Sequence, residues 1–301
     1  MTWVTWRQHR LEGVWTLAIT LLLAAMIALV AYEVRAATCA GATYSSGISF
    51  CFPYDGLGQL AQLLVQYNLY TYGLVVLPAL AGAFVGCPLV AREIENGTHR
   101  LAWTQGVTRL RWLSVKLLLV SIPLLIAAAL GGVMEIILIN QLGPSADRWA
   151  FFDQQAPMTV ASTLFALALG VACGAVIGRS IPAMAGTLLV FVAVRIGLAE
   201  IARPVYLPPL AYTTHDMASY SFPPRGYSSA WFVDQARFYD SSGHLLGTAY
   251  VGPTGVPAYA IQHFQPADRF WTFQGIETAI LCGLAALLIG FAVYWVSRRV
   301  S

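Results

Sequence analysis

The charged side chains that could do chemistry gather between residues 91 and 112, which read AREIENGTHRLAWTQGVTRLRW. Two carboxylates, Glu93 and Glu95, lie near the start of this segment. Its basic side chains are Arg92, His99, Arg100, Arg109 and Arg111. Carboxylates and cations at this density form charge-assisted hydrogen bonds, either within the chain or with a charged partner. The segment is therefore a candidate binding surface, and the long apolar stretches on both sides of it must hold that surface in place.

Three other ionisable residues, Glu135, Arg195 and Glu277, lie inside apolar stretches. Charged groups at membrane depth are costly, so they usually face a protein interior and pair with one another. At a rise of about 1.5 Å per helical residue, all three fall in the outer half of their spans. We predict a network of these three residues that holds an outer exit closed. The alternative is that Glu135 and Glu277 extend to the headgroup layer.

Motifs that carry catalysis are absent from the sequence: the phosphate-binding GxxxxGK[ST], the zinc-binding HExxH and the nucleophile motif GxSxG. The Cys and His residues also lack the spacing of zinc ligands. We therefore expect no enzyme activity, no metal site and no cofactor in this chain. Any uphill process must draw on an ion gradient or on a partner that hydrolyses ATP.

Five cysteines are present, and two of them, Cys39 and Cys51, lie in one polar stretch. They can form a disulfide if that stretch lies outside the cell, and free thiols are the alternative. The remaining three, Cys87, Cys173 and Cys282, lie in apolar stretches, where a small apolar side chain is the simplest interpretation.

The composition is that of a membrane protein, with 58% hydrophobic residues, only 10% charged residues and a mean hydropathy of +0.66. Soluble domains average roughly 25% charged residues. A helix needs about 20 apolar residues to cross a bilayer, and six stretches meet this length or nearly do. We predict an all-α polytopic membrane protein with six transmembrane helices, at residues 14–33, 69–90, 114–138, 158–178, 181–200 and 273–296.

Basic residues indicate which side of the membrane each loop faces, because cytoplasmic loops are enriched in Lys and Arg. Of the 17 Lys and Arg residues, ten lie in one set of short flanks: Arg7, Arg10, Arg92, Arg100, Arg109, Arg111, Lys116, Arg179, Arg298 and Arg299. We predict that this set, together with both termini, is cytoplasmic. Residues 1–12 hold two tryptophans and two arginines, a combination typical of an interfacial helix.

The predicted organisation is an interfacial helix at residues 1–12, five transmembrane helices within 13–200, an extracellular cap at 201–272, and a sixth helix with a cytoplasmic tail at 273–301. The short GRSIP connection predicts a tight helical hairpin that ends one helix at Gly178 and starts the next near Pro182. Within the cap, ARFYDSSGHLLGTAYV predicts a β-hairpin with DSSG as its turn.

The segment at 91–112 has local features of a shaped docking element. Gly97 and Thr98 predict a break after the first helix, and Thr98 and Thr108 can each cap a following helix through the side-chain hydroxyl. A merely solvated loop needs neither these breaks nor the two tryptophans, Trp103 and Trp112.

This order of elements resembles the permease of a type-2 ABC exporter. REIENGTHRLAWTQGVTRLRWLSVK is similar to the E-x-x-x-G-T segment that follows the second span in the actinobacterial version of that family, and GRSIPAMAGTLLVFVAVRIGL is similar to its turn between spans four and five. The resemblance implies a bacterial plasma-membrane exporter of hydrophobic or amphipathic substrates, such as a drug, an antibiotic, a lipid or a peptide. It also implies a second permease copy, with a homodimer expected, and two cytoplasmic ATPase subunits that bind Mg-ATP.

Within the resemblance, the segment after span two is a coupling helix that docks on the ATPase. The implied coupling residues are Glu93, Glu95, Gly97, Thr98, Trp103 and Gln105. Two alternatives stay open: a transporter coupled to protons or sodium, and a membrane sensor whose extracellular cap binds a ligand.

Overall fold

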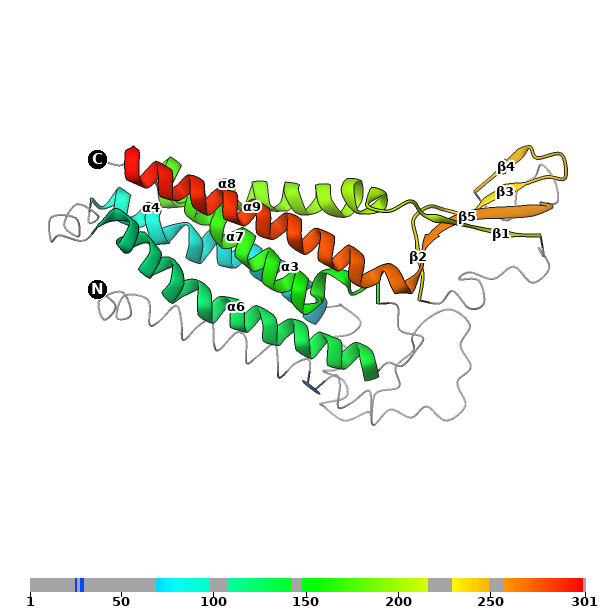
Figure 1. The fold of residues 1–301 in the computed structure, drawn as a ribbon, viewed down its shortest axis with the longest axis horizontal. Coiled ribbons are helices and arrows are strands. Elements are labelled where there is room, and N and C mark those ends of the chain that lie inside the picture. The colour runs from blue at the N-terminus through cyan, green and yellow to red at the C-terminus, as the bar shows by residue number, and fades with distance from the viewer. Residues whose placement is uncertain are drawn as a thin grey trace. The chain divides into compact units, whose positions relative to one another are not determined.

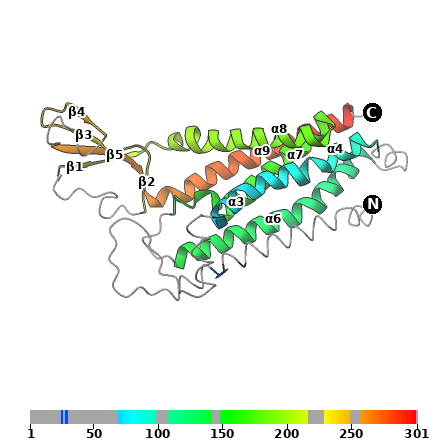
Figure 2. The same cartoon turned by 180° about the vertical axis from the view of Figure 1, so that it is seen from behind.

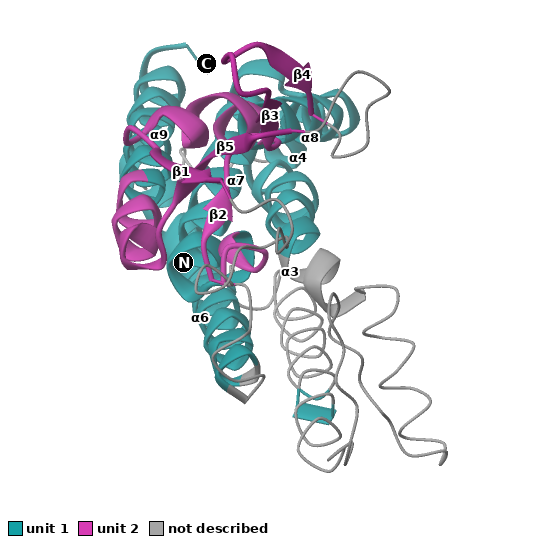
Figure 3. Cartoon of the chain, turned by 90° about the vertical axis from the view of Figure 1, so that its right-hand side faces the viewer, with its two compact units in different colours: residues 1–142, 153–195, 277–301 teal, residues 143–152, 196–276 magenta. Residues whose placement is uncertain are grey.

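The computed structural model describes residues 25, 28–29, 69–97, 108–141, 148–215, 229–248 and 257–299. The chain divides into two compact units, coloured separately in Figure 3. Residues 1–142, 153–195 and 277–301 form the first unit, and residues 143–152 and 196–276 form the second. The second unit thus includes a short stretch before α7 in addition to the region predicted as a cap at 201–272.

The first unit is helical (Figure 1). Its elements are α3 (Leu69–Leu80), the π-helix η1 (Ala81–Gly86), α4 (Pro88–Glu95), α6 (Arg109–Gln141), α7 (Ala156–Ile177), α8 (Ser180–Ile196) and most of α9 (Phe270–Arg298). Five helical stretches are long and apolar enough to cross a membrane: Val75–Glu95, Arg109–Ile137, Ala156–Ile177, Ser180–Val205 and Ala267–Arg298. They correspond to the second to sixth predicted spans. The first predicted span and the interfacial helix lie outside the described residues, apart from Ala25, Ala28 and Leu29, which are helical.

The tight hairpin between α7 and α8 forms as predicted. Gly178 caps α7 in the left-handed conformation, with φ of 66°, and its N–H bonds the carbonyl oxygen of Gly174. A side chain at this φ is strained, which is why glycine suits the end of the helix. Helix α8 begins two residues later with Pro182 in its first turn, where a missing N–H costs no helical hydrogen bond.

Helix α7 is the centre of the first unit, and 72% of its apolar window is buried. Glycines allow its backbone to touch that of its neighbours. A Cβ atom on Gly170 would lie 2.1 Å from the Gly82 carbonyl oxygen, and one on Gly174 would lie 2.6 Å from the Cys87 carbonyl oxygen. Small residues at such crossings drive helix association in membranes, where apolar area gives little preference for protein over lipid.

The second unit contains a five-stranded antiparallel sheet, so the protein is mostly helical rather than all-α. Its strands are β1 (Leu210–Thr214), β2 (Trp231–Phe232), β3 (Arg237–Tyr239), β4 (Leu245–Gly247) and β5 (Tyr259–Gln265). Strand β5 pairs with β1, β2 and β3, and β4 extends the sheet beyond β3. The sequence predicted only one hairpin of this sheet, and the all-α prediction missed strands β1, β2 and β5, because their pairing joins segments far apart in the chain.

The predicted β-hairpin is present as the pair of β3 and β4. Asp240 Oδ1 accepts hydrogen bonds from the Ser242 N–H at 2.9 Å, the Ser242 hydroxyl at 2.6 Å and the His244 N–H at 2.8 Å. Gly243 takes the left-handed conformation at φ 84°. The Ser242 hydroxyl, with help from the His244 and Ser242 N–H groups, lowers the pKa of the Asp240 carboxyl below its usual value.

Aromatic side chains form the core of the second unit near its helical end. Trp149 packs edge-on against Phe270 and Phe273 with ring centroids 5.3 Å apart, and it lies 5.4 Å from the ring of Trp231. The Arg203 guanidinium lies 4.0 Å from the centre of the Phe152 ring. These contacts join residues 148–152 to the later part of the chain, which explains why they belong to this unit.

Candidate functional site

Residues at the end of α4 and at the starts of α6 and α8 form a group that we call the α4-end cluster: Glu93, Glu95, Arg109, Trp112, Lys116 and Ser180. All of them belong to the first unit. In Figures 1 and 2 the end of α4, the start of α6 and the end of α9 lie at the same end of the helices. The connection between α4 and α6 is the segment that the sequence singled out.

Glu93 joins α4 to α6. Its Oε1 forms an ion pair with Lys116 Nζ, and its Oε2 accepts a hydrogen bond of 3.1 Å from Trp112 Nε1. Lys116 also lies over the Trp112 ring, 4.7 Å from its centroid. Trp112 and Lys116 are each only 4% exposed, so this charge pair is largely removed from water. Each charge of such a pair needs its partner, because removing one of them leaves a buried, unpaired charge that strongly destabilises the fold.

Glu95 joins α4 to α8. Its Oε2 accepts hydrogen bonds from the Ser180 N–H at 3.0 Å and from the Ser180 hydroxyl at 2.9 Å. Ser180 is the first residue of α8, so the carboxylate lies at the positive end of that helix, where negative charge is stabilising.

Arg109 joins α6 to α9. Its guanidinium donates hydrogen bonds to the carbonyl oxygens of Val296, at 3.2 Å, and Ser297, at 3.0 Å. These carbonyls belong to the last turn of α9, where they lack helical partners and where a cation is favourable. Together with the two glutamates, Arg109 ties the ends of α4, α6, α8 and α9 to one another.

Both ends of the intervening segment have the predicted local structure. Gly97, at φ 69°, lies just beyond the end of α4, and a Cβ at this position would meet no atom of the described residues within 4 Å. Thr108 caps α6, since its Oγ1 accepts a bond of 3.4 Å from the Arg111 N–H. The other three predicted coupling residues, Thr98, Trp103 and Gln105, lie outside the described residues.

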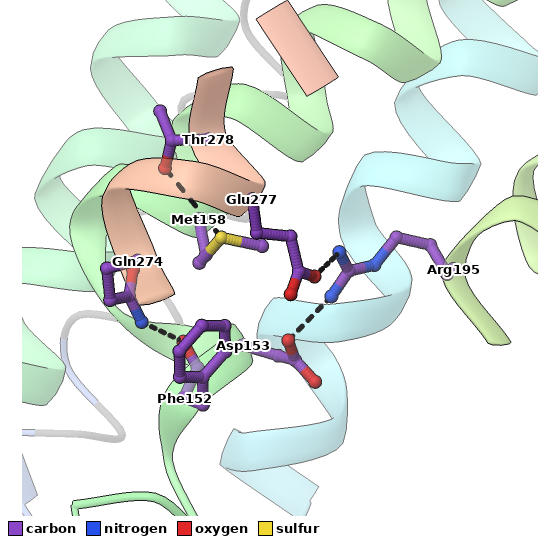
Figure 4. A network of polar contacts seen from close by, with 7 residues as sticks. All are labelled: Phe152, Asp153, Met158, Arg195, Gln274, Glu277 and Thr278. Atoms are coloured by element: carbon purple, nitrogen blue, oxygen red, sulfur yellow. Dashed lines mark hydrogen bonds and ion pairs between the residues drawn. The ribbon is translucent and has the colours of Figure 1, made fainter. Parts of the chain in front are cut away.

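A second group, which we call the Arg195 cluster, consists of Asp153, Arg195 and Glu277. Arg195 NH1 bonds Glu277 Oε1 at 2.8 Å, and its NH2 bonds Asp153 Oδ1 at 2.6 Å. Figure 4 shows the guanidinium reaching both carboxylates, which come from different segments. The Glu277 side chain is 0% exposed and that of Arg195 is 11% exposed. The structure thus brings together two of the three residues that we predicted as a network.

The third predicted member, Glu135, takes no part in these ion pairs, and Asp153 occupies that role instead. Glu135 is 0% exposed on α6, and neither of its carboxylate oxygens has a hydrogen-bond partner among the described residues. Counting residues along a span gives the depth of a side chain but not the direction in which it points. Depth alone therefore could not show whether Arg195 pairs with Glu135 on α6 or with Asp153, which precedes α7.

Three side-chain contacts were not predicted from the sequence: those made by Asp153, by Ser180 and by the pair Cys87 and Thr187. Asp153 lies five residues before the predicted span at 158–178, and Ser180 follows the predicted helix stop at Gly178, so both carry a weak signal. Cys87 and Thr187 carry none, since each is a small residue in an apolar stretch. Their side chains meet at 3.0 Å between α4 and α8, and both are buried.

The remaining predictions concern cysteines and metals. Cys39 and Cys51 lie outside the described residues. Cys87, Cys173 and Cys282 are free thiols. Among the residues described by the structure, no three His, Cys, Asp or Glu side chains are grouped so that they could hold a metal ion.

Comparison with known proteins gives a family match. The family model described as ABC-2 membrane transporter related matches residues 9–203, well over half of the chain. No curated protein and no solved structure matches. The match includes the α4-end cluster up to Ser180 and extends through α8, and five helical stretches can cross a membrane. The chain therefore belongs to the ABC-2 membrane transporter related family, and it is a multi-pass membrane protein of the ABC-2 permease type.

Proposed function

We propose that this chain is the transmembrane permease subunit of an ATP-driven ABC exporter that moves a hydrophobic or amphipathic substrate out of a bacterial cell. ATP is hydrolysed on separate cytoplasmic ATPase subunits, which bind Mg-ATP, and two permease copies form the pathway. The observation that carries the proposal is the α4-end cluster, in a chain whose family generally works with ATPase subunits.

The cluster gives the connecting segment a rigid base. Glu93 on one side of the segment pairs with Lys116 on the other, so both ends are fixed within a few residues of the loop itself. Arg109, the first residue of α6, is anchored on the end of α9. Because both ends of this connection are fixed, a displacement caused by a bound protein is transmitted to the helices. Flexible ends would move without displacing the helices.

The contacts of the cluster indicate two different roles among the predicted coupling residues. Glu93 and Glu95 are engaged inside the permease, so they act by holding the segment in position. We assign the direct contact with the ATPase to the part between Gly97 and Thr108, which includes Thr98, Trp103 and Gln105. This assignment places the cluster and both termini on the cytoplasmic side.

The Arg195 cluster is proposed as the outer gate. On α8 it lies 15 residues, about 22 Å, from the Ser180 contact, a distance that covers most of a bilayer's apolar core. One guanidinium holds carboxylates from two other segments, so moving α8 breaks both pairs together. In the closed state Arg195 is paired with both carboxylates, and such pairing is how ionisable groups are tolerated at membrane depth.

Co-purification tests the coupling role. The tagged permease is expressed with an ABC ATPase from its source organism, and the complex is purified in lipid nanodiscs. We expect a stable complex whose ATPase activity depends on the permease, and we expect W103A and Q105A to weaken the complex. Leu110→Ala serves as the control because Leu110 is an exposed apolar side chain on α6, just after the part between Gly97 and Thr108. If no complex forms, or if the loop variants bind as tightly as the wild type, the proposal fails.

One observation favours a second candidate, a transporter driven by protons or sodium ions. Glu135 is a buried carboxylate within α6 that has no hydrogen-bond partner among the described residues, and such groups mark ion pathways in membrane proteins. Under that function, E135Q would abolish gradient-driven uptake or efflux in vesicles that lack ATP. Under the exporter function, transport requires ATP in both the wild type and E135Q.

A further inference from the structure

Helix α8 is attached to the first unit by one narrow face. Only 22% of the apolar window in Ser180–Val205 is buried, against 72% for α7. The buried residues of α8 are Ala183, Thr187 and Phe191, which are spaced by four and so lie on one side of the helix. Phe191 stacks on Phe165 with ring centroids 5.9 Å apart. The remaining faces of α8 carry exposed apolar side chains, so little packing resists a movement of this helix.

The same face carries polar contacts at three levels. Ser180 at the start of α8 bonds Glu95, Thr187 in the middle bonds Cys87, and Arg195 near the end bonds Asp153 and Glu277. Seven residues bring Thr187 to within about 20° of Ser180 around the helix axis, and eight more place Arg195 about 80° further round, at the edge of the same side. Since the Thr187 hydroxyl donates to the Ala183 carbonyl oxygen, the Cys87 thiol is the donor in the middle contact.

Two of these three contacts come from α4 and its N-cap. Cys87 and Glu95 are eight residues apart, about 12 Å, and their partners Thr187 and Ser180 are seven residues apart, about 10 Å, in the opposite direction. The two helices are thus antiparallel and joined at two points. These two contacts link α4 to α8, so a movement of α4 can be passed to α8 through them.

We propose that α8 is the rigid connection that carries a displacement of the α4 end to the Arg195 cluster, and that Glu95 is the positioning residue that starts this transfer. When the segment after α4 is pushed, Glu95 draws the N-terminus of α8 with it, and Arg195 separates from Asp153 and Glu277 at the far end. This inference rests on the proposed function. It assigns Glu95 a task different from that of Glu93, whose partners Trp112 and Lys116 lie on α6.

The experiment measures hydrogen–deuterium exchange at the far end of α8. The permease–ATPase complex in nanodiscs is compared without nucleotide and after trapping with ATP and orthovanadate. We expect trapping to raise exchange in peptides that cover residues 190–196. E95A removes the acceptor of both Ser180 bonds, so it should reduce this rise by half or more while the complex still forms. E95Q keeps a carbonyl oxygen as acceptor, so it should retain most of the rise.

Two further variants serve as controls. Arg92 is exposed in the same last turn of α4, and R92A should respond as the wild type does. T187C places a second thiol opposite Cys87, and an oxidised pair should leave the nucleotide response intact because α4 and α8 already move together. If E95A prevents assembly, S180A provides the test, since it removes one of the two bonds and should give an intermediate response.

The outcomes separate the two proposals. Failure of the wild-type complex to form contradicts the proposed function. A stable complex with no nucleotide-dependent change at residues 190–196 overturns the inference alone. The inference is also overturned if both E95A and S180A show the full rise in exchange at residues 190–196. It is likewise overturned if the oxidised T187C variant loses that rise.

Discussion

Glu95, the last residue of α4, accepts two hydrogen bonds from Ser180, the first residue of α8, at 3.0 Å from the backbone N–H and 2.9 Å from the hydroxyl. The two residues are 85 positions apart in the chain. Their contact belongs to the α4-end cluster. It links the charged segment at residues 91–112 to α8, the helix that carries Arg195.

The Glu93–Lys116 pair should contribute measurably to stability. E93A removes the carboxylate that pairs with a cation only 4% exposed, and breaking a buried pair from one side costs about 3 kcal/mol. Thermal unfolding of the detergent-purified protein should therefore show a clearly lower midpoint. The double variant E93Q/K116M, which removes both charges, should unfold at a higher temperature than E93A. Equal midpoints for E93A and the wild type would count against a structural role of this pair.

The buried Glu135 carboxylate should lower the unfolding free energy of the protein. Both of its oxygens lack a hydrogen-bond partner among the described residues, and the side chain is fully buried. E135M keeps a similar volume without the polar atoms, so it should raise the unfolding free energy by about 1–3 kcal/mol. Glu277 is the matched control because it is equally buried but paired with Arg195. E277M should therefore lower the unfolding midpoint, and a stabilised E277M would refute the importance of the Arg195 cluster.

The backbone contact between α7 and η1 should tolerate no side chain at Gly170. In G170A the new methyl group would begin 2.1 Å from the Gly82 carbonyl oxygen, so the two helices must separate. Overpacking of this kind costs about 1–3 kcal/mol. A methyl group on Gly283 in α9 would meet no atom of the described residues within 4 Å, so G283A should be as stable as the wild type. The comparison requires thermal unfolding of both variants, and equal losses would contradict it.

The hairpin of β3 and β4 should loosen in acid. Its turn lowers the pKa of Asp240 below the usual value of 3.8, so the ionised carboxylate stabilises the folded hairpin above that pH. This stabilisation is lost as the pH falls through the lowered pKa, because the protonated carboxyl accepts hydrogen bonds less well. Amide protection at Ser242 and His244, corrected for the intrinsic exchange rate at each pH, should fall in this range. D240N should abolish the pH dependence, and an unchanged profile in D240N would show that another group is responsible.

The membrane class and most local signals were predictable from the sequence, because each depends on residues close together in the chain. Apolar stretches of sufficient length predicted the second to sixth spans, and a glycine at the end of an apolar run predicted the stop at Gly178. The Thr108 cap and the hairpin around Asp240 follow from the same local chemistry. The strands β1, β2 and β5 were not predicted, since their pairing joins segments about 30 to 50 residues apart.

Hydropathy and charge along the chain were enough to identify a polytopic membrane protein with a charged segment between its second and third spans, because they decide which stretches can enter a bilayer. Only the tertiary structure decided which charges meet. It joined Glu93 to Lys116 and Glu95 to Ser180, and it chose Asp153 rather than Glu135 as a partner of Arg195. These choices depend on how each helix is rotated about its axis. That rotation is set by close contacts such as those of Gly170 and Gly174, which involve residues far apart in the chain.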